Sequence, residues 1–61
     1  MNLKLVNIYT DEEITIENVT AYEPNDYGTR VYTELNGNRD MTTYLHFFIP
    51  STIADELSNL F

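Results

Sequence analysis

The order of apolar and polar positions predicts four strands followed by one helix. β-Branched and aromatic residues concentrate in four segments bounded by turn-forming residues, namely 3–9, 13–22, 29–35 and 40–49. Pro50 ends the last strand, and the apolar spacing over residues 51–61 is that of one helical face, formed by Ile53, Leu57, Leu60 and Phe61. The sequence therefore predicts an α+β domain, an antiparallel β-meander of three to four strands with one C-terminal helix packed on one face.

The second strand changes the face on which its apolar residues lie. Ile14 and Ile16 have one parity, whereas Val19 and Ala21 have the other. Because side chains alternate strictly along a strand, such a change needs an extra residue, so we expect a bulge or bend near residues 17–18.

The turn between the third and fourth strands is predicted at Asn36-Gly37-Asn38. A two-residue turn would place Val31 opposite Thr42, which mixes the apolar faces of the two strands. A three-residue loop, with Asn38 in the left-handed conformation, brings the apolar faces together. We therefore expect the three-residue loop.

The fourth strand is apolar on both faces. Its odd positions, Leu45, Phe47 and Ile49, are expected to meet the helix. Aromatic residues dominate the other face, and we predict that they form a partner-binding surface: Tyr32, Tyr44, His46 and Phe48. In the alternative arrangement, the N-terminal strands curl over this face into a small barrel and bury it.

Composition and charge narrow the classes of partner. The 61 residues correspond to one small domain, residues 1–61, and they contain no Cys to form a disulfide. Ten acidic residues against three basic ones give a net charge of −7, which disfavours direct binding to nucleic acid or to anionic membranes. A basic protein partner fits this charge, as does a purely solubilising role. The candidate acidic surface consists of Asp11, Glu12, Glu13, Glu17, Glu23 and Asp26.

Candidate catalytic and ligand-binding patterns are weak. His46 is the only histidine, and no nucleophile motif surrounds Ser51 or Ser58. The acidic run at 11–13 lacks the spacing of a calcium loop, and the two glycines are too far apart for a phosphate loop. We therefore expect no enzymatic activity, no metal and no cofactor.

The sequence leaves three functional hypotheses, all non-enzymatic. The first is a small acidic protein-interaction module that self-associates as a homo-oligomer or binds a protein partner through the aromatic face. The second is an inhibitor of the phage type, which imitates nucleic acid to block a DNA- or RNA-binding enzyme, and the third is a structural or assembly component. Without a leader or a long apolar run we expect a cytoplasmic protein, and the Asn-, Tyr- and Ile-rich composition is typical of the AT-rich genomes of phages and mobile elements.

Overall fold

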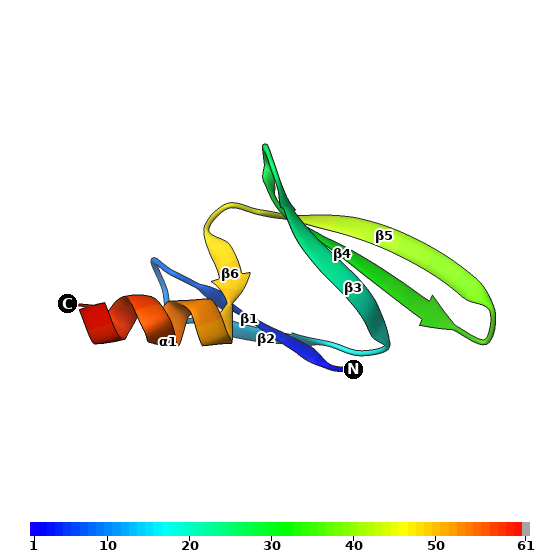
Figure 1. Ribbon diagram of the computed structural model, residues 1–61, viewed down its shortest axis with the longest axis horizontal. Coiled ribbons are helices and arrows are strands. Elements are labelled where there is room, and N and C mark those ends of the chain that lie inside the picture. The colour runs from blue at the N-terminus through cyan, green and yellow to red at the C-terminus, as the bar shows by residue number, and fades with distance from the viewer. Residues whose placement is uncertain (61) are drawn as a thin grey trace.

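The computed structural model describes the backbone of residues 1–60 and the side chains of residues 1–56. Six strands precede one helix along the chain (Figure 1). Their bounds are β1 (Leu3–Asn7), β2 (Glu13–Ile16), β3 (Val19–Asn25), β4 (Gly28–Leu35), β5 (Asn38–Leu45), β6 (Phe48–Pro50) and α1 (Ser51–Leu60).

The strands form two antiparallel sheets of three strands each, in the orders β2-β1-β6 and β3-β4-β5. The predicted α+β class is confirmed, and β3-β4-β5 is a meander. The expected single meander is wrong, however, because the predicted second and fourth strands each divide between the two sheets. The two sheets pack against each other at the core, to which β1 contributes Leu3 and Leu5 and the other sheet contributes Val19 and Val31.

The bend in the second strand lies where the parity change predicts it. β2 ends at Ile16 and β3 begins at Val19, with Asn18 between them at a φ of 60°. The bend lets Ile16 and Val19 contact the same core from different sheets. A second irregularity between Val19 and Ala21 turns Ala21 to the exposed side, so the predicted sharing of one face by these two residues is wrong.

The β4–β5 turn has two residues, and the expectation of three is wrong. Leu35 pairs with Asn38, and the left-handed residues are Asn36 (φ 53°) and Gly37 (φ 81°). Two consecutive left-handed residues form the turn whose twist matches that of the flanking strands, and Asn-Gly is the preferred pair for it. Val31 consequently lies opposite Thr42.

A three-residue loop would be favoured only if a buried face ran the whole length of the hairpin, and the half of the hairpin next to the turn is exposed. Leu35 and Met41 are each 57% exposed. The two-residue turn also sets Glu34 opposite Arg39, where their side chains approach to 3.4 Å, whereas the longer loop would have set Glu34 opposite Asp40. Unlike charges directly opposite each other favour the observed register.

The predicted fourth strand breaks at residues 46–47. β5 ends at Leu45, where the chain leaves the β3–β4–β5 sheet. The next strand, β6, pairs with β1 in the other sheet, and Pro50 lies opposite Leu5. Gly28 makes room for this corner, because a Cβ atom there would collide with the carbonyl oxygen of Tyr44 and lie 2.8 Å from the His46 nitrogen.

The core is small. Among the described side chains, the buried apolar cluster consists of Leu3, Leu5, Val19 and Val31, and four partly buried residues pack against it, Ile14, Ile16, Tyr44 and Phe48. The radius of gyration of 12.0 Å exceeds the ~10.5 Å expected for a compact chain of this length. The excess reflects an elongated shape, with the β4–β5 turn at one end and the helix at the other (Figure 1).

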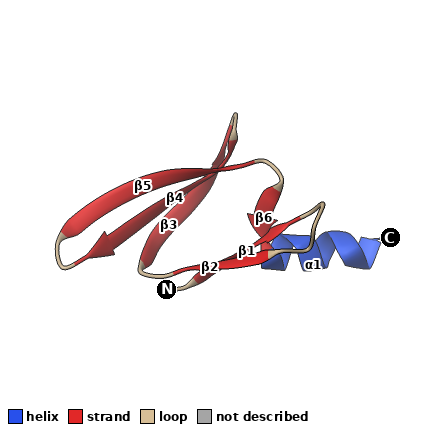
Figure 2. Cartoon of the chain, turned by 180° about the vertical axis from the view of Figure 1, so that it is seen from behind, coloured by secondary structure: helices blue, strands red, loops and turns tan. Residues whose placement is uncertain are grey.

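The helix follows Pro50 as predicted and contacts β1 and β6. It lies at the opposite end of the molecule from the β4–β5 turn (Figure 2). Ser51 and Ala54 are half-buried, whereas Ile53 is exposed. The other members of the predicted apolar face, the side chains of Leu57, Leu60 and Phe61, lie outside the described residues.

Candidate partner-binding site

The turn between β1 and β2 is built around the side chain of Asn7. This residue is nearly buried, and its Oδ1 accepts hydrogen bonds from the backbone N–H groups of Tyr9 (2.9 Å) and Thr10 (3.2 Å). Its own backbone accepts from Asp11 N and donates to Glu12 O, both at 2.8 Å. An Asn side chain that bonds the backbone two and three residues ahead is a common way to fix a turn. The turn therefore has a defined shape.

This turn contacts the corner at which the chain passes from β5 to β6. The backbone N–H of Ile8 donates to the carbonyl of Phe47 at 2.8 Å. The Phe47 ring lies 6.3 Å from that of Tyr9, 5.7 Å from the edge-on ring of His46 and 5.1 Å from Phe48. These spacings are typical of interacting aromatic pairs. We call the set Ile8, Tyr9, His46, Phe47 and Phe48 the aromatic corner.

The aromatic corner presents apolar surface to solvent. Tyr9 is 74% exposed and Ile8 is 47% exposed, while Phe47 and Phe48 are half-buried. Phe48 also packs against the buried core, which ties the corner to the rigid part of the domain. Exposed apolar groups held on a fixed support are characteristic of interaction sites.

Three acidic residues follow Ile8 and Tyr9 of the aromatic corner closely along the chain. Asp11 and Glu12 lie on the same turn as Tyr9, and Glu13 begins β2 directly after it. Glu13 approaches Lys4 to 3.7 Å, but both side chains are more than half exposed, so this ion pair is largely screened. We call Asp11, Glu12 and Glu13 the acidic rim.

The predicted aromatic face is not one surface. Tyr44 and Phe48 pack against the core beneath the N-terminal strands, as in the alternative arrangement with curled strands. His46 lies in the exposed corner. Tyr32 pairs with Met41 on β5, and because Met41 and Tyr44 are three residues apart, Tyr32 and Tyr44 lie on opposite sides of the sheet. Two differences from the expected structure separate these residues. The β4–β5 pairing is shifted by one residue from the register expected for a three-residue loop, and the chain leaves the sheet after Leu45.

Tyr32 belongs instead to a small polar group on the outer side of the β3–β4–β5 sheet. Its hydroxyl donates to Glu23 Oε1 at 2.8 Å, and Arg30 Nη1 lies 3.8 Å from the same oxygen. The side-chain contact with Tyr32, and to a smaller extent the Glu23 carboxylate, raise the pKa of Arg30 above its ordinary value. Glu23 is therefore locally compensated, which weakens its part in any acidic surface.

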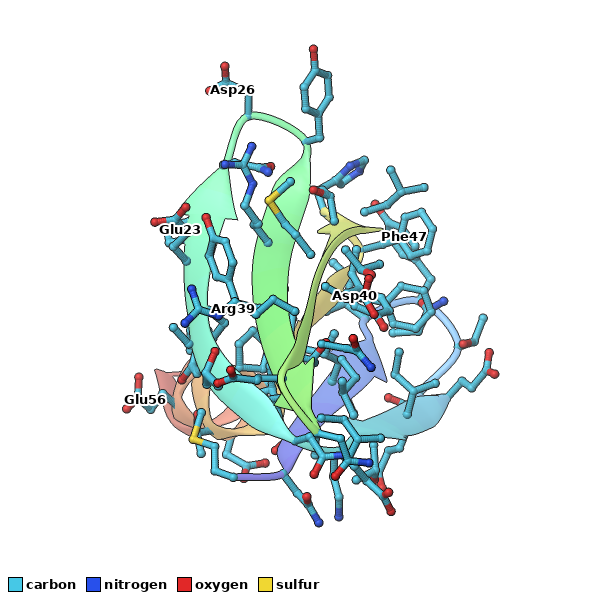
Figure 3. The ribbon with its side chains drawn as sticks, turned by 90° about the vertical axis from the view of Figure 1, so that its right-hand side faces the viewer. Glu23, Asp26, Arg39, Asp40, Phe47 and Glu56 are labelled. Atoms are coloured by element: carbon cyan, nitrogen blue, oxygen red, sulfur yellow. The ribbon has the colours of Figure 1, made fainter. Side chains whose placement is uncertain are left out.

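The remaining predicted acidic residues are also separated from the acidic rim. Glu17 lies at the bend between β2 and β3. Asp26 lies in the β3–β4 turn, where the Asn25 side chain accepts from the N–H groups of residues 27 and 28. Figure 3 shows Glu23 and Asp26 well apart from Phe47. The six residues occupy several segments rather than one array.

Sequence reasoning missed Ile8 and Tyr9 as site residues and assigned Phe47 to a helix-facing side. The available indication was Asn7, a turn-forming residue that lies three positions before the polar run Thr10-Asp11-Glu12-Glu13. It would have ended the first strand two residues earlier than residue 9.

Three further observations concern ligands, membranes and relatives. Among the described residues, no three His, Asp or Glu side chains gather as a metal site. Over the same residues, no helix has the length and apolar character needed to cross a bilayer. Comparison with protein-family models, with curated proteins and with solved structures gives no match to this chain.

Proposed function

We propose that this chain is a small, non-enzymatic protein-interaction module that binds a basic segment of a protein partner at the aromatic corner. The observation that carries the proposal is Tyr9, which is 74% exposed, lies with its ring tilted against that of Phe47, and has its backbone N–H held by Asn7 in the turn that also carries Asp11 and Glu12. Tyr is among the residues enriched in interaction hot spots, and protein interfaces commonly have a polar rim around an apolar centre.

The aromatic rings and carboxylates of this region favour a partner segment that is both basic and partly apolar. The Tyr9 and Phe47 rings offer apolar area and faces for an Arg guanidinium, while Asp11 and Glu12 supply opposite charge at the border. The net charge of −7 attracts cationic segments over several ångströms and raises their association rate at low salt. Imitation of nucleic acid receives less support, because the acidic residues do not form an ordered array.

A selection from a random peptide library tests the proposal. The immobilised protein should enrich peptides that combine Arg or Lys with aromatic or aliphatic residues. Binding of a selected peptide should weaken as salt rises, because the acidic rim is exposed and screened. Tyr9→Ser should weaken it about tenfold or more, as expected for loss of a hot-spot side chain.

The matched control is Leu35→Ser at the β4–β5 turn. Leu35 is 57% exposed, so this change removes a comparable apolar group far from the aromatic corner, and it should leave peptide affinity unchanged. A selection without basic enrichment, or equal affinities of Tyr9→Ser and the wild type, would contradict the proposal.

A further inference from the structure

The β5 strand leaves a long, unprotected sheet edge. It is the outer strand of the order β3-β4-β5, and its pairing with β4 runs without interruption from Leu45 to Asn38. Seven of its eight residues are exposed. The opposite edge, β3, carries Pro24 and the irregularity after Val19, two devices that discourage further strand pairing. β5 has neither.

The turn geometry determines which backbone groups of β5 face outward. A two-residue turn makes Leu35 and Asn38 a hydrogen-bonded pair, so every second residue after Asn38 directs its N–H and C=O to β4. The residues between them direct theirs away from the sheet, namely Arg39, Met41, Thr43 and Leu45. These groups form a ladder ready for another strand.

The charge distribution permits a second copy of this acidic chain to approach here. The hairpin of residues 28–45 holds two of the three cations and two of the ten acidic residues, so its net charge is zero. The whole charge of −7 therefore lies elsewhere. On β5 itself, Arg39 and Asp40 are neighbours of opposite sign that alternate to opposite faces of the sheet (Figure 3).

The solvent-accessible area of the single chain is also larger than that of a compact monomer, as expected if part of it is buried in a dimer. The chain exposes 4674 Å², whereas a compact monomer of its 7.1 kDa mass exposes about 4,100 Å². The excess of about 600 Å² is close to the share of about 800 Å² that each partner contributes to a standard interface.

We infer that two copies of this chain pair antiparallel through β5, joining their β3–β4–β5 sheets into one continuous sheet. A two-fold axis at Thr42 uses every outward residue, because Arg39 then faces Leu45 and Met41 faces Thr43 of the second copy. Thr42 faces itself across the axis, and threonine pairs are favourable there. This pairing does not rest on the proposed partner binding, because it uses other residues.

Removal of one outward N–H tests the pairing. Wild-type protein at tens of micromolar should sediment with twice the monomer mass of 7.1 kDa. Met41→Pro lacks the outward donor and should sediment as a monomer, since proline is tolerated at an edge whose N–H faces solvent. Met41→Ala loses the side chain but keeps the N–H, so it should remain a dimer. A monomeric wild type, or dimers of all three, would overturn the inference.

Cysteine cross-linking tests the register without altering the backbone. The chain has no native Cys, so Thr42→Cys gives one thiol per copy. The two Cα atoms at position 42 should lie about 4.5 Å apart, within the range of a disulfide. The control is Thr15→Cys, an exposed threonine on β2, an edge strand of the other sheet.

Mild oxidation should convert Thr42→Cys to a covalent dimer and leave Thr15→Cys largely monomeric. Equal cross-linking of the two variants would overturn the two-fold register at β5. Peptide binding at the aromatic corner should be unchanged in Met41→Pro, so failure of the dimer and failure of the partner site give different results.

Discussion

Replacement of Asn7 by alanine should destabilise the domain and loosen the turn that carries Tyr9. The Asn7 Oδ1 atom accepts two backbone hydrogen bonds, from Tyr9 and Thr10, at 2.9 and 3.2 Å. Asn7 is only 9% exposed, so water can replace this acceptor only in part. Alanine cannot accept either bond.

The magnitude follows from these contacts. Each hydrogen bond contributes about 1 kcal/mol net, and a donor left partly desolvated adds to the loss, so Asn7→Ala should cost about 2–3 kcal/mol. A domain of 61 residues has a free energy of unfolding of roughly 3–9 kcal/mol. The substitution should thus remove a large part of the stability.

Urea denaturation followed by circular dichroism measures this cost. Asn25→Ala is the matched control, because its Oδ1 also accepts two backbone N–H groups, at 2.8 and 2.9 Å, from Tyr27 and Gly28. Asn25 is less buried than Asn7, so water replaces it more easily and its loss should cost about 1 kcal/mol. Equal costs for the two variants, or a cost below about 0.5 kcal/mol for Asn7→Ala, would refute the reasoning.

Two further predictions concern the core and the glycines. Leu5 is 0% exposed, so Leu5→Ala should cost about 3–5 kcal/mol and leave most chains unfolded, whereas Leu35→Ala, at 57% exposure, should cost less than about 0.5 kcal/mol in the same urea titrations. Gly28→Ala should abolish folding as judged by dispersion of NMR signals, because its Cβ atom would collide with the corner at residues 44–46. Gly37→Ala meets no atom within 4 Å and strains only a φ of 81°, so it should cost about 1–2 kcal/mol and still fold.

The elements that local rules specify could be predicted from the sequence. The parity change from Ile16 to Val19 located the bend, because alternation is strict along a strand. Pro50 and the apolar spacing after it predict the position of the helix. Ile53, however, is exposed and is not part of a buried helix face. The strand segments themselves were recognised from their β-branched and aromatic content.

The register of the β4–β5 hairpin could not be predicted by matching apolar faces. Matching presumes that a buried face runs the whole length of the hairpin, whereas Leu35 and Met41 lie beyond the core. The chemistry of the turn was the better guide, since Asn36-Gly37 alone favours two residues.

The break after Leu45 has no local cause in the sequence. Residues 44–49 contain no Gly, Pro or Asp, and the chain turns there because β6 must reach β1 in the other sheet. The compensating residue is Gly28, far away in sequence, whose role is visible only once it lies opposite the corner. The aromatic corner depends on this break, and its residues could therefore not be grouped beforehand.

The most direct test of the partner-binding account is a two-dimensional NMR titration of the protein with a basic peptide taken from the library selection. Shift changes should concentrate at residues 8–13 and 46–48, which contain the aromatic corner and its acidic rim. Changes centred on the outer side of the β3–β4–β5 sheet, around Arg30 and Tyr32, would contradict it.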